Sequence, residues 1–167
     1  KAVELRKKLS GKNLSINIKI YSLSEGMSGN STMEDLPTLF ELIYLYFTAP
    51  RYDEEDFENF KNSEREILTN IKLDPEEVFS DFYISKLYNN HYRTRPWSLK
   101  LLDEINYQQS FNFYQERFAN AGDFTFYFVG SFNLEEMQPL VETYLGGLPS
   151  THRKEHWKDR NVDYFRG

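Results

Sequence analysis

The sequence predicts an α+β fold, in which an antiparallel or mixed β-sheet carries helices packed on one face. Three observations predict it. Residues 14–20 alternate apolar and polar side chains, as a half-buried strand does, and residues 124–128 place Phe at every second position. Several longer segments instead repeat apolar residues at helical spacing. Strands are few, helices are many, and the two do not alternate strictly along the chain.

The first third of the chain predicts a helix, two strands and a second helix. Residues 2–9 are typical of a helix that stops at Gly11, and the strand over 14–20 follows. Residues 22–31 contain two glycines and predict a turn and a second strand. Thr32 and Asp35 resemble a capping box with Asp in place of Glu, so a helix is expected from Thr32 to Ala49-Pro50.

The remainder of the chain is predicted to be mainly helical. Helices are expected from Asp53, from Asp74-Pro75 to about residue 89, near 98–105 and near 107–120, with an irregular basic and aromatic loop at 90–97. A strand over 124–130 follows. Asn133 and Glu136 then form a second capping-box pattern, which opens a helix that stops at Gly146-Gly147.

Composition limits the possible functions. The 167 residues are 40% hydrophobic and 17% aromatic, which suits one ordinary domain with its own core. The net charge is −6 without a long basic run, so nucleic acid is not expected as a partner. The absence of cysteine excludes disulfides, thiolate catalysis and Cys-rich zinc sites. No apolar run reaches the roughly 18 residues of a membrane span.

The chain is interpreted as a fragment of a longer polypeptide, because its first residue is Lys and lies inside a predicted helix. Residues 1–150 are expected to form the α+β domain, with its N-terminal part missing. Residues 151–167 are polar and are expected to be a linker toward a following domain.

Several segments together resemble the pitrilysin/insulinase-type zinc metallopeptidases, and most closely a domain of the long bacterial probable zinc proteases. The strongest of them runs from Tyr114 to Phe126. The others are residues 26–29, 35–36, 45–51, 89–96, 128–130 and 144–149. No single piece is diagnostic, but their order and spacing are fairly specific.

The resemblance implies a clam-shell of two halves, each built from two α+β domains, that encloses a peptide. Only the first domain of such an enzyme holds zinc, through two His of an inverted motif and a distal Glu. In the helix that resembles the distal-Glu helix, Glu64-Arg65 and Ile67-Leu68 are present, but the ligand position falls at Asn70 or Ile71. Because neither can replace a carboxylate on zinc, the chain is expected to be a non-catalytic counterpart from the second half.

The string His152-Arg153-Lys154-Glu155-His156 matches the inverted zinc motif letter for letter. On a helix, His152 and His156 would share a face and Glu155 could polarise a bound water. However, the flanks are polar and cationic, only 11 residues follow for a distal Glu, and the string lies past the Gly-Gly-Leu-Pro stop. We interpret it as part of the linker, with a free-standing zinc site as the alternative.

The loop residues His91, Arg93, Arg95 and Trp97 are candidates for a groove that contacts a peptide. The alternative is structural, with the arginines paired to nearby acids and the Trp covering the edge of the core.

The functional hypothesis is a non-catalytic domain of a zinc metalloendopeptidase that helps to form a peptide-enclosing chamber. The fragment itself is expected to be inactive and to hold no cofactor, with zinc in the parent enzyme. Its partners would be the other domains of the same polypeptide and peptide substrate. The family resemblance favours the periplasm over the cytoplasm. The alternative is a catalytically dead scaffold or binding subunit of the same fold.

Overall fold

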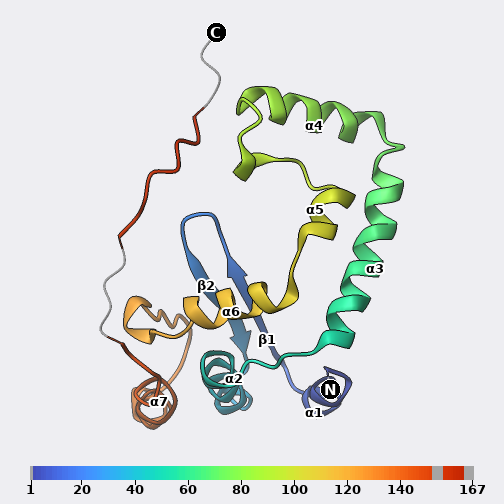
Figure 1. Cartoon of the computed structure of the whole chain (residues 1–167). Coiled ribbons are helices and arrows are strands. Elements are labelled where there is room, and N and C mark those ends of the chain that lie inside the picture. Colours follow the sequence, from blue (N-terminus) through green and yellow to red (C-terminus); the bar gives the residue numbers. More distant parts are fainter. Residues whose placement is uncertain (1, 152–155, 164–167) are drawn as a thin grey trace. The chain divides into compact units, whose positions relative to one another are not determined.

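The computed structural model describes residues 2–151 and 156–163, which belong to two units (Figure 1). The first unit comprises residues 1–52 and 111–156, and the second comprises residues 53–110 and 157–167. The first holds α1 (Ala2–Leu9), β1 (Leu14–Ile20), β2 (Glu25–Ser31), α2 (Leu36–Thr48), the 3₁₀ turn η2 (Ala121–Asp123), α7 (Leu134–Leu140) and the π-helical turn η3 (Val141–Leu145). The second holds α3 (Glu54–Ile71), α4 (Pro75–Leu87), the 3₁₀ turn η1 (Tyr92–Thr94) and α5 (Leu99–Glu104). Helix α6 (Tyr107–Arg117) begins in the second unit and ends in the first.

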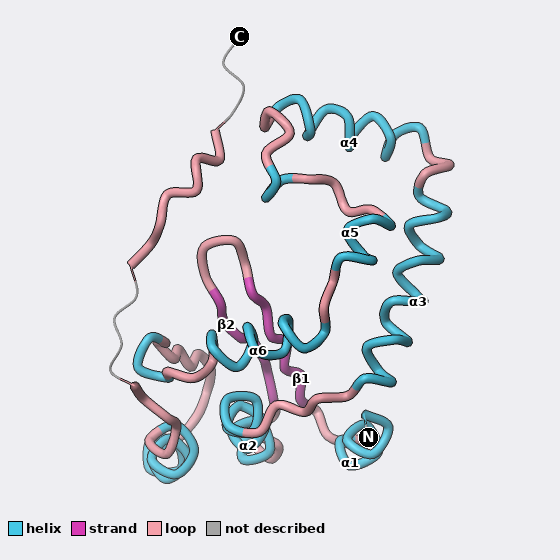
Figure 2. Tube along the Cα trace, viewed as in Figure 1, coloured by secondary structure: helices cyan, strands magenta, loops and turns pink. Residues whose placement is uncertain are grey.

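The predicted α+β class is confirmed, with an antiparallel hairpin of β1 and β2 packed against helices (Figure 2). The hairpin pairs Leu14 with Ser31 at one end and Ile20 with Glu25 at the other. Just beyond these ends, Thr32 N–H donates to Asn13 O at 3.0 Å and Tyr21 N–H donates to Ser24 O at 2.6 Å. These two bonds determine which residues of the hairpin hydrogen-bond across it.

Residues along an antiparallel strand point their backbone groups alternately toward and away from the partner strand. Because Thr32 bonds across the hairpin, the even-numbered residues of β2, Gly26, Ser28 and Asn30, direct their N–H and C=O groups at β1. Met27 and Gly29 therefore direct theirs away from β1, at the outer edge of the strand.

Helix α2 supplies most of the core of the first unit. Its apolar residues Leu39, Phe40, Leu42, Ile43 and Phe47 recur at helical spacing and are buried, as the sequence pattern predicts. Phe47 makes edge contacts with Phe118 at 5.3 Å and with Phe124 at 5.0 Å between ring centroids. Large rings in such tilted arrangements contribute more than their buried area alone.

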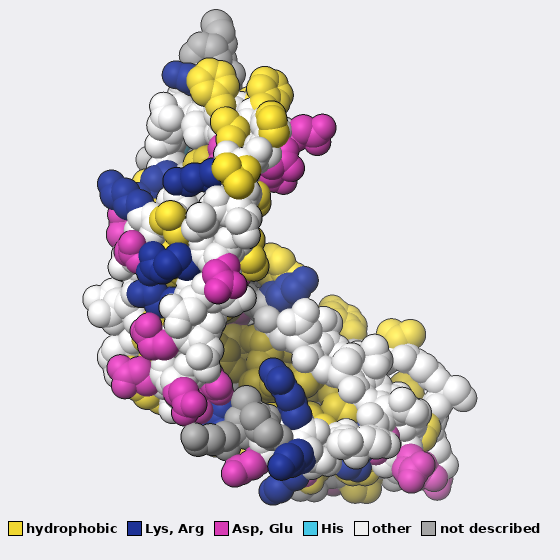
Figure 3. Space-filling view, turned by 90° about the vertical axis from the view of Figure 1, so that its right-hand side faces the viewer, with side chains coloured by type: hydrophobic (Ala, Val, Ile, Leu, Met, Phe, Trp, Pro, Cys, Tyr) yellow, Lys and Arg dark blue, Asp and Glu magenta, His cyan; other side chains and the backbone are white. Residues whose placement is uncertain are grey.

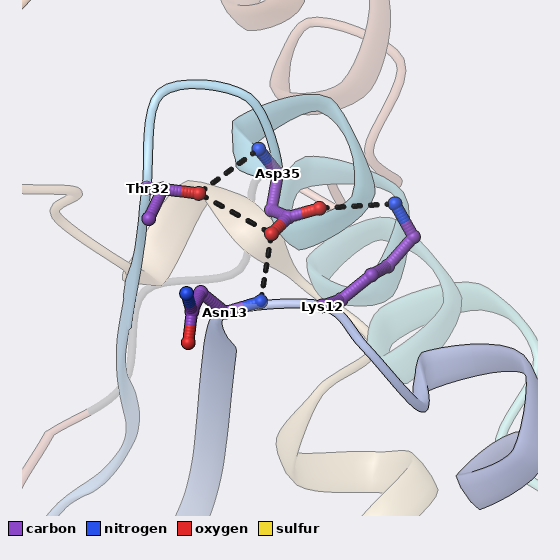
Figure 4. Close-up of polar contacts among 4 residues, drawn as sticks. All are labelled: Lys12, Asn13, Thr32 and Asp35. Atoms are coloured by element: carbon purple, nitrogen blue, oxygen red, sulfur yellow. Dashed lines mark hydrogen bonds and ion pairs between the residues drawn. The ribbon is translucent and has the colours of Figure 1, made fainter.

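Asp35 joins three segments of the first unit (Figure 4). Its carboxylate accepts hydrogen bonds from Asn13 N–H at 2.7 Å, Lys12 Nζ at 3.0 Å and Thr32 Oγ1 at 3.2 Å. The bond from Asn13, followed by the one from Lys12, holds the pKa of Asp35 below its usual value. The strand pair and the start of α2 are thus tied to one charged group.

The predicted start of this helix at Thr32 is wrong, since α2 begins at Leu36 after a turn. One half of the capping box forms, because Thr32 Oγ1 accepts from Asp35 N–H at 3.4 Å. The reciprocal half does not form, because Thr32 N–H is already bonded to Asn13 O. The extra hairpin bond therefore postpones the helix by one turn.

In the second unit, the helices predicted to begin at Asp53 and Asp74 are confirmed, and both Asp side chains cap them. Asp53 accepts from Asp56 N–H at 3.1 Å at the start of α3, and Asp74 accepts from Glu76 N–H at 2.9 Å at the start of α4. Leu68 on α3 and Leu102 on α5 are buried. Helix α4 has no buried residue, and hydrophobic side chains gather on the surface over it (Figure 3).

Two predicted elements differ from the structure, and a third begins and ends as predicted but changes its helix type near its end. Residues 124–129 are extended but form no ladder, so the strand predicted over 124–130 is wrong for the described part of the chain. The helix predicted over 107–120 ends at Arg117. The last helix begins at Leu134 and widens at Val141, where Gly146 N–H bonds Val141 O at 2.9 Å, shortly after Pro139 has removed one helical donor.

Candidate functional site

A cleft of about 430 Å³ lies within the first unit. One rim is β2, from Glu25 to Gly29, and the other is the extended segment from Asp123 to Phe128. The floor is apolar and consists of Ile16, Leu39 and Ile43. We call this feature the β2 cleft.

The second rim is held in place by its aromatic side chains. Phe124 and Phe126 pack against Phe47 at 5.0 and 6.1 Å, and Phe128 stacks on the fully buried Phe40 at 5.1 Å. Tyr127 and Val129, in contrast, are 84% and 98% exposed. The alternation that predicted a strand is therefore present in the side chains, although the backbone has no ladder partner within the described residues.

Charged groups lie at one end of the β2 cleft. Glu25 on the β2 rim is 3.8 Å from the Arg117 guanidinium, which also contacts Glu116 at 3.5 Å and lies over the Phe113 ring. Asp123 lies on the other rim. The sequence pattern does not predict this cleft, and its only signal in the sequence is the Phe alternation at 124–128.

The predicted groove residues at 91–97 lie together in the second unit. Several of their polar side-chain atoms bond to other residues of the chain. Trp97 Nε1 donates to Glu64 Oε2 at 2.9 Å, and Arg95 lies 3.6 Å from Glu104 and donates to Tyr92 O. His91 Nδ1 accepts from Arg93 N–H at 3.2 Å, while its Nε2 is 3.1 Å from Arg160 O. The Arg95–Glu104 contact agrees with the structural alternative, whereas Trp97 is 42% exposed. A peptide-binding role for the loop remains a prediction.

In the part of the chain that the structure describes, the position of the family's distal zinc ligand is not occupied by a carboxylate. Asn70 and Ile71 stand at the end of α3, where the resemblance places the distal carboxylate. Within residues 2–151 and 156–163, no group of three His, Cys, Asp or Glu side chains could hold a metal. Of the motif-like string, His156 is exposed, whereas His152 and Glu155 lie outside the described residues. No described helix is long and apolar enough to span a membrane.

The chain is similar to known proteins in both sequence and fold. Residues 104–166 match the Peptidase M16 inactive domain. The chain is 24% identical over 135 residues to the probable zinc protease PqqL of Haemophilus influenzae. The aligned region is 80% of this chain and 14% of that protein. Its fold resembles the ferredoxin protease FusC, solved as a mutant in complex with Arabidopsis ferredoxin, with a TM-score of 0.69 and 16% identity over 98% of this chain.

These matches confirm the predicted resemblance: residues 104–166 match an inactive M16 domain, and the chain is similar to a probable zinc protease. M16 is another name for the pitrilysin/insulinase-type metallopeptidases, the family that segments of this sequence resemble. The chain spans about a seventh of the length of the H. influenzae relative and 17% of the FusC chain.

Proposed function

We propose that this chain is a non-catalytic domain of a zinc metalloendopeptidase and helps to form the chamber that encloses the peptide substrate. The observation that carries the proposal is the match of residues 104–166 to an inactive M16 domain. The uncharged residues at the family's distal ligand position, Asn70 and Ile71, support it. Zinc, the reacting water and its general base would then belong to another domain of the parent protein.

Within such an enzyme, this domain would help to enclose and position the peptide substrate and would take no part in the chemical reaction. Binding energy from parts of a substrate remote from the scissile bond can be used to orient the reacting centre. The surface of the loop at 91–97, where Arg93 and Tyr92 are exposed, is the candidate for such contacts. The periplasm is the compartment that we propose for the parent.

Metal analysis of the purified 167-residue chain tests the proposal. We expect no stoichiometric zinc after dialysis against a slight excess, and no cleavage of an unstructured peptide. The His156→Ala variant serves as the matched control, because any zinc held by the string 152–156 would be lost with it. One tightly bound zinc per chain that disappears in His156→Ala would instead support the free-standing site.

The scaffold alternative makes a different prediction for the parent polypeptide. A scaffold subunit would lack an inverted zinc motif and its distal Glu in every domain, whereas an enzyme would carry both in one of them. Zinc content and peptide cleavage by the full-length parent separate the two. Stoichiometric zinc with cleavage supports the enzyme, and the absence of both supports the scaffold.

A further inference from the structure

Helix α4 carries an apolar stripe that the described part of the chain leaves largely uncovered. The stripe consists of four side chains that are each more than half exposed: Val78, Phe79, Phe82 and Tyr83. It is already ordered, since the Phe79 and Tyr83 rings stack with their centroids 6.4 Å apart. A contiguous apolar surface of this kind marks a contact site on a folded protein (Figure 3).

The two ends of this stripe carry opposite charges. Glu76 lies in the first turn of α4, and Lys86 lies in the last turn. Both residues are exposed, and Lys86 Nζ is 5.7 Å from the centroid of the Phe82 ring. A spacing of three, four and three residues places four side chains along one side of the helix: Glu76, Phe79, Tyr83 and Lys86.

A second copy of α4, laid antiparallel on the first, matches both the apolar stripe and the charges. About a two-fold axis level with Asp81, Phe79 of one copy lies opposite Tyr83 of the other, because both are equally far from the axis. Glu76 of each copy likewise lies opposite Lys86 of the other. A parallel pairing would instead bring like charges together at both ends.

We propose that α4 is a self-association surface, on which a second copy of the same protein docks by antiparallel pairing of the two helices. The pairing is closed, because each copy uses the same surface. It would bury roughly 500 Å² of apolar side chain on each copy, or about 1,000 Å² in all. This area is at the lower end for specific interfaces, so the dimer is weak and forms at high protein concentration.

The proposal goes beyond the chamber function and does not depend on it. A second copy is favoured over a different partner because it supplies an apolar row of the same length and both charges at the required spacing. A different domain of the parent on this surface is therefore an outcome that the experiment must separate from self-association.

Sedimentation velocity of the full-length parent over a range of concentrations measures the association. We expect a monomer–dimer equilibrium that Lys86→Glu and Glu76→Lys each weaken about tenfold, because either change places like charges at both ends of the pairing. An equal mixture of the two variants should recover the original association, because in the mixed dimer both pairs again carry opposite charges. Loss of folding in either variant would not be reversed by mixing.

Asp81→Lys is the matched control. It makes the same change in net charge as Glu76→Lys, at an exposed position on the opposite side of α4, so it should leave the association unchanged. A parent that stays monomeric at every concentration, as it would if another of its domains covered α4, overturns the proposal. A dimer that Asp81→Lys weakens equally, or that the mixture does not restore, overturns it as well.

Discussion

Asp35 shows how a single carboxylate can set the start of a helix and the position of a hairpin. It is 8% exposed, and its partners come from the segment before β1 and from the turn between β2 and α2. The sequence pattern identified Thr32 and Asp35 as a local pair. It could not show that Asn13 and Lys12, more than twenty residues earlier, supply the stronger partners.

The lowered pKa of Asp35 makes its contribution depend on pH. A carboxylate with a depressed folded-state pKa stabilises the fold above its unfolded pKa, near 3.9, and loses that contribution as the pH falls through the folded value. We therefore expect Asp35→Asn to lower the melting temperature by several degrees at pH 7. The difference in melting temperature between this variant and the unmodified chain should narrow steadily below about pH 4.

Thermal unfolding followed by circular dichroism between pH 3 and pH 7 measures this gap. Asp81→Asn, at an exposed position on α4, is the matched control and should change little at any pH. A gap that stays constant across this range would show that the charge of Asp35 does not stabilise the fold.

At the scale of elements, α2 and α4 have the same length but opposite environments. Both are 13 residues long, yet α2 buries five apolar side chains and α4 buries none. The apolar residues of α2 follow the spacing of one helical face, so its burial could be predicted from sequence. The exposure of Phe79 and Phe82 on α4, at 67% and 61%, could not be predicted, because it depends on what packs against the helix.

This contrast predicts unequal costs for the same substitution. Phe47→Ala removes a ring that is 6% exposed and contacts three other Phe rings, so we expect a loss of about 3–5 kcal/mol in the free energy of unfolding. Phe79→Ala, at a largely exposed position on α4, should change it by no more than about 0.5 kcal/mol. Urea denaturation of both variants measures the difference, and similar losses would contradict the assigned core.

At the scale of the whole molecule, the chain spans 14% of the H. influenzae relative and 17% of the FusC chain. Its role in the proposed chamber can be separated from the zinc chemistry by deletion. If residues 1–167 shape the chamber but hold no ligand, a parent that lacks them should keep its zinc and lose most of its peptide cleavage, about tenfold or more, because substrate is no longer positioned.

Zinc content by atomic absorption and cleavage of a quenched fluorescent peptide measure the two quantities. The unmodified parent and a parent carrying Phe79→Ala in this domain are the controls. Loss of zinc on deletion, with the rest of the parent still folded, would show that this domain takes part in the metal site.

Four features could be predicted from the order of the amino acids alone: the α+β class, the helices that begin at Asp53 and Asp74, the apolar face of α2 and the resemblance to the M16 peptidases. These depend on local spacing, capping chemistry and segment order, which are all properties of nearby residues. The later start of α2, the hydrogen bond between Trp97 and Glu64 and the β2 cleft depend instead on tertiary contacts. A backbone group is satisfied or left open according to segments that are distant in sequence, so the Phe alternation at 124–128 could predict an extended segment but not whether it has a partner.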